Sequence, residues 1–128
     1  MDEFTDEIAL AGWDPRFARV LAKAVANGVA VAIIDANGAD GGQVYENTDL
    51  YSWDEGGWCD WSSSGGLGGG WGSTGSGGIA YAAGEGEPGE EVLVEFRGER
   101  HRVQVQPSGY WVFAAAGEYT GDVPERVR

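Results

Sequence analysis

The sequence is poor in positive charge. Lys and Arg together number 8, against 21 Asp and Glu, so the formal net charge is −13 at pH 7. Phosphate backbones and anionic lipid surfaces would repel such a chain, because nucleic-acid-binding domains usually carry the opposite balance. We therefore expect no nucleic-acid partner and no membrane partner. An acidic surface suits solubility, cations or a basic protein partner instead.

Cysteine and long apolar runs are also scarce. The chain has one cysteine, Cys59, which cannot form an internal disulfide and excludes a secreted disulfide framework. Residues 1–10 are acidic, whereas a secretory signal begins with basic residues and continues with a long apolar run. No segment approaches the roughly 20 apolar residues that span a bilayer. We expect a soluble, cytoplasmic protein.

Motifs for cofactors, metals and nucleophilic catalysis are missing as well. The glycine-rich segment 65–72 lacks the Lys-Ser/Thr pair of a phosphate-binding loop, although a backbone anion nest stays open. Segment 35–42 carries oxygen donors without the spacing of a calcium loop. His101 is the only histidine, and nothing indicates that it meets Cys59 to form a thiolate pair. We expect no cofactor, no metal ion and no enzymatic activity.

What the chain does contain is enough apolar material for one core. It has 128 residues, of which 42% are hydrophobic and 12% aromatic, the size and composition of a single domain spanning 1–128. We predict an α+β fold, mainly an antiparallel β-sheet or small sandwich with an amphipathic N-terminal helix. In this scheme residues 1–28 are helical, residues 29–116 form the β part and residues 117–128 are a tail or edge segment.

The N-terminal part carries the helix signals. In 14–28, Asp14 can cap a helix, Pro15 suits its first turn and Gly28 suits its end. Apolar residues between them follow a helical spacing, so we predict a helix over 14–28. A shorter helix is predicted within 2–12, where early acids complement the positive end of the helix dipole.

The remainder reads as strands. Residues 29–36 form a short β-branched apolar run, typical of a strand covered on both faces. Residues 91–96 and 100–106 alternate with period two, joined by a tight hairpin at 97–99. With the apolar segment 110–116 they are predicted to form a three-stranded meander. A further strand with an irregular middle is predicted over 43–53.

The segment 58–78 combines three tryptophans with many glycines. Large apolar side chains argue against a flexible linker. In a structural interpretation, 57–63 and 77–83 are strands, with Trp58 and Asp60 on one face and Cys59 and Trp61 on the other. In a functional interpretation, residues 62–78 form an exposed loop that presents Trp71. We favour strands that flank a partly mobile loop over 62–78.

Candidate binding residues fall into two groups. Acids and aromatics alternate in the middle of the chain, and basic residues cluster at the predicted hairpin. The leading hypothesis is a non-enzymatic interaction protein, inhibitor- or immunity-like, that binds a basic protein through its acidic surface and aromatic–glycine region. The alternative is a small-ligand or carbohydrate-binding module using tryptophan platforms, and an enzyme using Asp54, Asp60 or His101 is a third possibility. The candidate residues are Trp53, Asp54, Trp58, Asp60, Trp61, Trp71, Arg97, Arg100 and Arg102.

Overall fold

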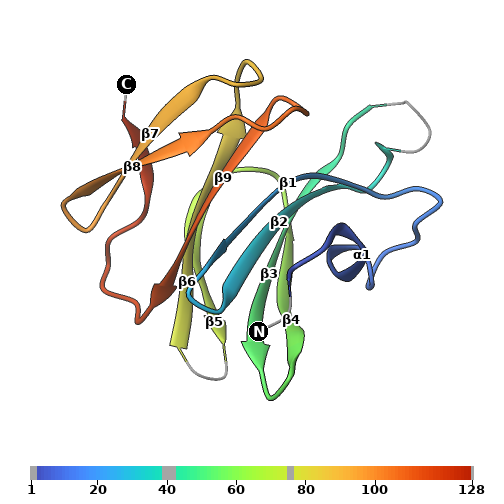
Figure 1. Ribbon diagram of the computed structural model, residues 1–128, viewed down its shortest axis with the longest axis horizontal. Helices are drawn as coiled ribbons and strands as arrows, with labels where there is room; N and C mark the ends of the chain where they lie inside the picture. Colours follow the sequence, from blue (N-terminus) through green and yellow to red (C-terminus); the bar gives the residue numbers. More distant parts are fainter. Residues whose placement is uncertain (1–2, 39–42, 75–76, 128) are drawn as a thin grey trace.

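The computed structural model describes residues 3–38, 43–74 and 77–127. Antiparallel strands dominate, and the described helix is a single turn near the N-terminus (Figure 1). The fold is therefore the predicted one, mostly antiparallel sheets in a small sandwich with a short N-terminal helix. The elements are α1 (Asp6–Ala9), β1 (Arg19–Ala26), β2 (Val29–Asp35), β3 (Glu46–Asp54), β4 (Gly57–Gly65), β5 (Gly69–Thr74), β6 (Gly77–Glu85), β7 (Glu91–Phe96), β8 (Glu99–Gln104), β9 (Tyr110–Gly117) and β10 (Glu125–Val127).

Three sheets lie in layers. Sheet A has the order β1-β2-β3-β4, sheet B the order β5-β6-β9 and sheet C the order β10-β7-β8. Sheet B is the middle layer (Figure 1). Its strands pack Ile79 and Val112 against sheet A, and Ala80 and Phe113 against sheet C. Strands with two covered faces must be apolar on both, which explains the composition of β6 and β9.

The outer face of sheet A is covered by the N-terminal segment. Phe4 and Ala9 pack against Ala30, Ala32 and Tyr51, and the Tyr51 hydroxyl donates a hydrogen bond to the Ala9 carbonyl (3.0 Å). The opposite side chains of β2 face sheet B. The strand predicted over 29–36 is therefore confirmed, and every residue of β2 is buried.

The helix predicted over 14–28 is wrong. A turn follows Asp14, whose carbonyl accepts the amides of Phe17 and Ala18, and the chain then enters β1, which pairs with β2. Asn27 and Gly28 both have positive φ, 46° and 81°, the conformation of a two-residue hairpin turn. The Asn-Gly pair thus starts a hairpin, and pairing with the buried strand β2 overrides the helical spacing. The shorter helix predicted within 2–12 is present as α1, with Asp6 and Glu7 in its first turn.

The predicted meander is also wrong in its third strand. Strands β7 and β8 form the expected hairpin, but β9 pairs with β6 rather than with β8. One face of β8 is polar, which suits an outer sheet, whereas β9 is apolar on both faces and needs the middle layer. The tail forms β10, an edge strand on β7.

Most of the loop predicted over 62–78 is strand. Strand β4 continues to Gly65, and β5 occupies 69–74. Glycine is needed here because neighbouring backbones approach closely. A Cβ at Gly72 of β5 would overlap the Leu50 side chain of β3 in the opposite sheet, and within sheet B a Cβ at Gly78 would lie 2.8 Å from the carbonyl of its cross-strand partner Gly117. The glycines permit this close packing, so the structural interpretation of this segment extends further than predicted.

One edge of sheet A is closed by side chains from the β8–β9 connection. The Gln106 amide donates to the Lys23 carbonyl (2.9 Å) and accepts from the Lys23 amide (3.3 Å), and the Ser108 hydroxyl donates to the Leu21 carbonyl. These bonds satisfy backbone groups of β1 that a neighbouring strand would otherwise bind. They also attach sheet A to sheet B at this side.

Candidate functional site

Two of the predicted residues, Trp71 and Arg97, meet on the surface. Trp71 lies on β5, and Arg97 occupies the turn between β7 and β8 with φ of 52°. The Arg97 guanidinium lies 5.5 Å from the Trp71 ring centroid and 4.9 Å from that of Phe96. It also donates to the Glu118 carbonyl (2.7 Å). The tight turn therefore holds a guanidinium over an aromatic ring, a cation–π arrangement.

Tyr119 completes this cluster. Its ring stands perpendicular to that of Trp71, with centroids 5.6 Å apart and an interplanar angle of 88°. Tyr119 is 70% exposed, while Trp71 is half-buried. The Trp71 indole N–H donates to the Asp122 carbonyl, and its ring contacts Phe96 at 5.8 Å. The indole is thus held on several sides, and the tyrosine presents its ring to solvent. We call Trp71, Arg97, Glu118 and Tyr119 the Trp71 cluster.

Two adjoining cavities open beside the Trp71 cluster. One, of about 360 Å³, is lined by Trp71, Ser73, Glu118 and Tyr119 together with Gly72, Gly77 and Gly78. The second, of about 250 Å³, has Trp53 on its wall and shares Gly77, Gly78 and Glu118 with the first. Among the described residues that line these two cavities, Glu118 is the one acidic residue, and it lines both. Aromatic walls with a carboxylate at the shared border favour a ligand that is flat or positively charged.

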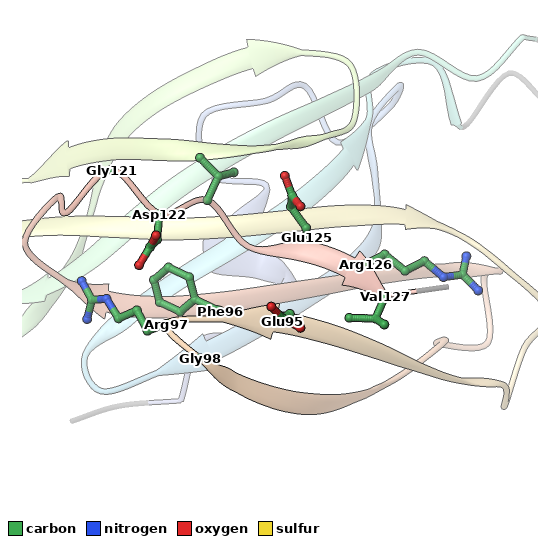
Figure 2. Close-up of a pocket in the computed structure, with 10 residues that line it drawn as sticks. Glu95, Phe96, Arg97, Gly98, Gly121, Asp122, Glu125, Arg126 and Val127 are labelled. Carbon is green, nitrogen blue, oxygen red and sulfur yellow. The ribbon is translucent and has the colours of Figure 1, made fainter.

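A larger cavity, of about 530 Å³, lies on the other side of Arg97, between the end of β7 and the segment 121–127. Figure 2 shows Arg97 and Arg126 extending to opposite ends of this cavity, with Phe96 and Glu95 between them. Its lining mixes carboxylates with guanidiniums and includes one deeply buried aromatic ring, Phe96. This cavity offers less exposed aromatic surface than the Trp71 cluster does.

The other two predicted arginines do not join Arg97. Arg100 and Arg102 lie on the outer face of sheet C, and each contacts an acid of β7: Arg100 lies 3.7 Å from Glu95 directly opposite, and Arg102 lies 3.8 Å from Glu91 on the diagonal. These cross-strand pairs balance the charge of the exposed face. We conclude that Arg100 and Arg102 are part of a paired surface, whereas Arg97 belongs to the Trp71 cluster.

Trp53 and Trp58, at the facing ends of β3 and β4, contact each other. Their rings meet edge to face at 5.6 Å, and Trp58 also contacts Phe4 of the N-terminal segment at 5.2 Å. Asp54 is exposed at the β3–β4 turn. The Trp58 ring is therefore engaged in internal packing, while Trp53 also reaches the smaller of the two adjoining cavities.

Asp60 belongs to an acidic pair on the outer face of sheet A. Burial and the negative charge of Asp49 raise the pKa of Asp60 above its ordinary value. Asp49 is 1% exposed, and one of its oxygens accepts the Trp13 indole N–H (2.7 Å). Its other oxygen has no hydrogen-bond partner among the described residues. Burial and both carboxylates also raise the pKa of Tyr51.

Strand β4 separates its side chains as predicted. Trp58 and Asp60 face the N-terminal segment, while the Trp61 indole N–H donates to Ser52. Trp61 is 40% exposed and lines neither of the two adjoining cavities. The predicted residues therefore lie on several different surfaces. The Trp71 cluster is the one that combines aromatic rings, a guanidinium and an adjoining cavity.

Neither a metal site nor a thiolate pair is formed by the described residues. No group of three or more His, Cys, Asp or Glu within residues 3–38, 43–74 and 77–127 is placed to hold a metal ion. In segment 35–42, Asp35 accepts the amides of Asn37 and Tyr45, and residues 39–42 lie outside the described part of the chain. Cys59 lies in sheet A and His101 in sheet C, where the imidazole packs on Phe113 at 4.9 Å.

Sequence reasoning missed Glu118 and Tyr119. Both lie in the segment after β9, which shows no periodicity and was assigned to the tail. An aromatic residue between two glycines in a polar segment is the one signal that singles out Tyr119. Its partner Trp71 lies 48 positions away in sequence, so only the fold brings the two rings together.

No known protein family, no curated protein and no solved structure matches the chain. The helix that the structure describes is too short to cross a membrane.

Proposed function

We propose that this protein is a non-enzymatic binding protein whose partner is a basic protein. The observation that carries the proposal is the Trp71 cluster: a Trp–Tyr pair already held in place, with Glu118 at the border of two cavities. Tryptophan, tyrosine and arginine are the residues most enriched in the energetic centres of protein interfaces. Because Trp71 is fixed by internal contacts, binding costs little ordering of this side chain.

Charge determines which partner the surface favours. A net charge of −13 attracts a positively charged protein and accelerates its encounter with the cluster. An inhibitor- or immunity-like role towards a basic enzyme is the concrete form of this proposal. We also propose that the protein acts in the cytoplasm, where the lone thiol of Cys59 stays reduced.

The test is an unbiased peptide selection. Random peptides displayed on phage are selected on the immobilised protein at about 0.15 M NaCl, where charges more than about 8 Å apart are largely screened. We expect the enriched peptides to carry more Lys and Arg than the unselected library, and their affinity to fall as salt is raised. Enrichment of neutral or acidic peptides would contradict the proposal.

The carbohydrate alternative rests on the same exposed Tyr119 ring, because sugars stack on aromatic faces. A glycan array probed with the same immobilised protein separates the two functions. Binding of a neutral glycan in the absence of any selected basic peptide would favour the carbohydrate-binding module, and the reverse result supports the protein partner.

A further inference from the structure

The cavity of about 360 Å³ bordered by Trp71 and Tyr119 has a lining that suits a flat, positively charged group. Its two aromatic walls stand perpendicular, at 88°, with centroids 5.6 Å apart. The Gly72, Gly77 and Gly78 backbone forms other parts of the lining and carries no side chains to fill the space. A cavity with two aromatic walls and a small-residue floor accepts a flat or compact group at the end of a chain.

The protein itself supplies an example of what stacks on these rings. The Arg97 guanidinium lies against the rings of Trp71 and Phe96, and a hydrogen bond that it donates to the Glu118 carbonyl holds it there. Arg97 does not line the cavity bordered by Trp71 and Tyr119, so that cavity is left for an external group. A guanidinium is planar, stays charged and stacks on aromatic faces.

Charge at the cavity favours a cation over an anion or a neutral sugar. Glu118 is exposed and is the acidic residue among the described residues of the lining, and no basic residue is among them. The Arg97 guanidinium donates to the backbone carbonyl of Glu118, which leaves the Glu118 carboxylate as the acidic group of the described lining. A carboxylate or phosphate would meet the negative charge of Glu118 here, whereas a guanidinium meets two aromatic rings and that carboxylate.

We infer that this cavity takes the guanidinium group of an arginine side chain presented by the basic partner. The inference rests on the proposed function and names the group that anchors it. The arginine lies against Trp71 and Tyr119, and its charge is balanced by Glu118. It is a binding site distinct from the one that Arg97 fills within the chain.

The experiment uses short peptides as probes. A blocked pentapeptide with a central arginine between glycines is compared with the same peptide carrying citrulline, which keeps the planar shape and loses the charge, and with one carrying lysine. Binding is followed by the indole N–H resonance of Trp71 in ¹H–¹⁵N NMR spectra. We expect the arginine peptide to bind about tenfold more tightly than the citrulline peptide, with lysine between them.

Matched variants test the walls of the cavity. Tyr119→Ala and Glu118→Gln alter exposed side chains, so the fold is retained, and each is expected to weaken arginine-peptide binding by about fivefold or more. The controls are Tyr45→Ala, which removes a tyrosine that is 55% exposed elsewhere, and Glu55→Gln at the β3–β4 turn. Both controls are expected to leave binding unchanged.

The results separate the two proposals. Equal binding of the arginine and citrulline peptides, or unchanged binding by Tyr119→Ala and Glu118→Gln, overturns the arginine site. If phage-selected basic peptides still bind those two variants with full affinity, the arginine site is wrong while the proposed function stands. If no basic peptide binds the unaltered protein, both are wrong.

Discussion

At the scale of single residues, glycine decides how closely neighbouring strands and sheets approach. Gly72 faces Leu50 of the opposite sheet, and a Cβ at position 72 would overlap the Leu50 side chain. Within sheet B, Gly84 lies against its cross-strand partner Trp111, where a Cβ would come within 2.7 Å of the indole nitrogen. These positions explain a glycine content that resembles a linker in the sequence. Both positions require glycine because there is no room for a Cβ, since neither glycine has a positive φ that would itself favour glycine.

We predict that Gly72→Ala lowers the free energy of unfolding by about 1–3 kcal/mol, the usual cost of inserting a methyl group into a packed core. Urea unfolding followed by circular dichroism measures the loss. Gly57→Ala is the matched control, because a Cβ at Gly57 has no neighbour within 4 Å; its stability should change little.

A second substitution tests the contact itself. If the Leu50 side chain is the obstacle, Leu50→Ala creates room for the new methyl group. The double variant should then lose less free energy than the sum of the two single variants. Strict additivity would show that Gly72 and Leu50 do not compete for the same space.

At the scale of elements, the N-terminal segment acts as a cover for sheet A. Phe4 packs on Tyr51 at 4.8 Å, Trp13 donates to the buried Asp49, and the Ala9 carbonyl accepts from Tyr51. On the same face Asp60, which is itself exposed, lies close enough to Asp49 for its pKa to be raised. The covered face therefore contains an unfavourable interaction between two carboxylates.

We predict that Asp60→Asn stabilises the protein at neutral pH. Because burial and Asp49 raise the pKa of Asp60 in the folded state, the folded chain binds that proton more tightly than the unfolded chain does. The stability gained from the proton is lost as pH rises through the folded-state pKa. Asn removes the repulsion, so the free energy of unfolding at pH 7 should rise by about 0.5 kcal/mol, a value suited to a partly exposed carboxylate.

Measuring the stability of Asp60→Asn at several pH values shows whether repulsion between the two carboxylates causes its gain. The advantage of Asp60→Asn should shrink below pH 4, where the wild-type carboxyl is protonated, and Asp54→Asn on the same hairpin serves as control. An advantage that is the same at pH 3 and pH 7 would rule out the repulsion between Asp49 and Asp60.

Local signals predicted several elements and failed at others for identifiable reasons. The buried run of β2 and the alternation in β7 and β8 suffice to predict strands, because each is bounded by turn residues. Strand β1 was predicted as a helix because its apolar spacing also fits a helical period. The positive φ of Asn27 and the pairing with β2 resolve that ambiguity, and pairing is a contact that local periodicity does not encode.

At the scale of the whole molecule, acidity is the dominant property. The chain has 21 acids against eight Lys and Arg, and part of the charge is balanced in pairs such as Lys23 with Asp6 (2.8 Å). The remaining acids repel one another in the folded state. Encounter with a positively charged partner would relieve that repulsion.

We predict that salt stabilises the folded protein. Raising NaCl from about 0.01 M to 0.3 M shortens the Debye length severalfold, so the melting temperature should rise by a few degrees, corresponding to about 0.5 kcal/mol. Differential scanning calorimetry measures the shift. In a variant with Glu3→Gln, Glu55→Gln and Glu87→Gln, three exposed positions, the salt effect should be smaller; an equal effect would mean that net charge is not its source.

The candidate site was harder to predict from the sequence than the strands were, because it depends on which residues the fold brings together. Trp71 and Arg97 were each predicted as binding residues, but no local pattern joins β5 to the β7–β8 turn or to Tyr119. Trp58 was predicted on the same grounds as Trp71, and Arg100 on the same grounds as Arg97, yet Trp58 packs against Phe4 and Arg100 pairs with Glu95. Whether an aromatic or charged side chain is available depends on its neighbours in space.

The sequence alone determined the acidic charge, the mainly antiparallel β architecture and the positions of most strands, because composition and period-two alternation are local properties of the chain. Only the tertiary structure decided that residues 19–26 pair with β2, that β9 lies beside β6, and that Trp71, Arg97, Glu118 and Tyr119 share one surface. These outcomes rest on contacts between residues far apart in sequence, where close packing at glycines and the burial of two-faced strands select one arrangement.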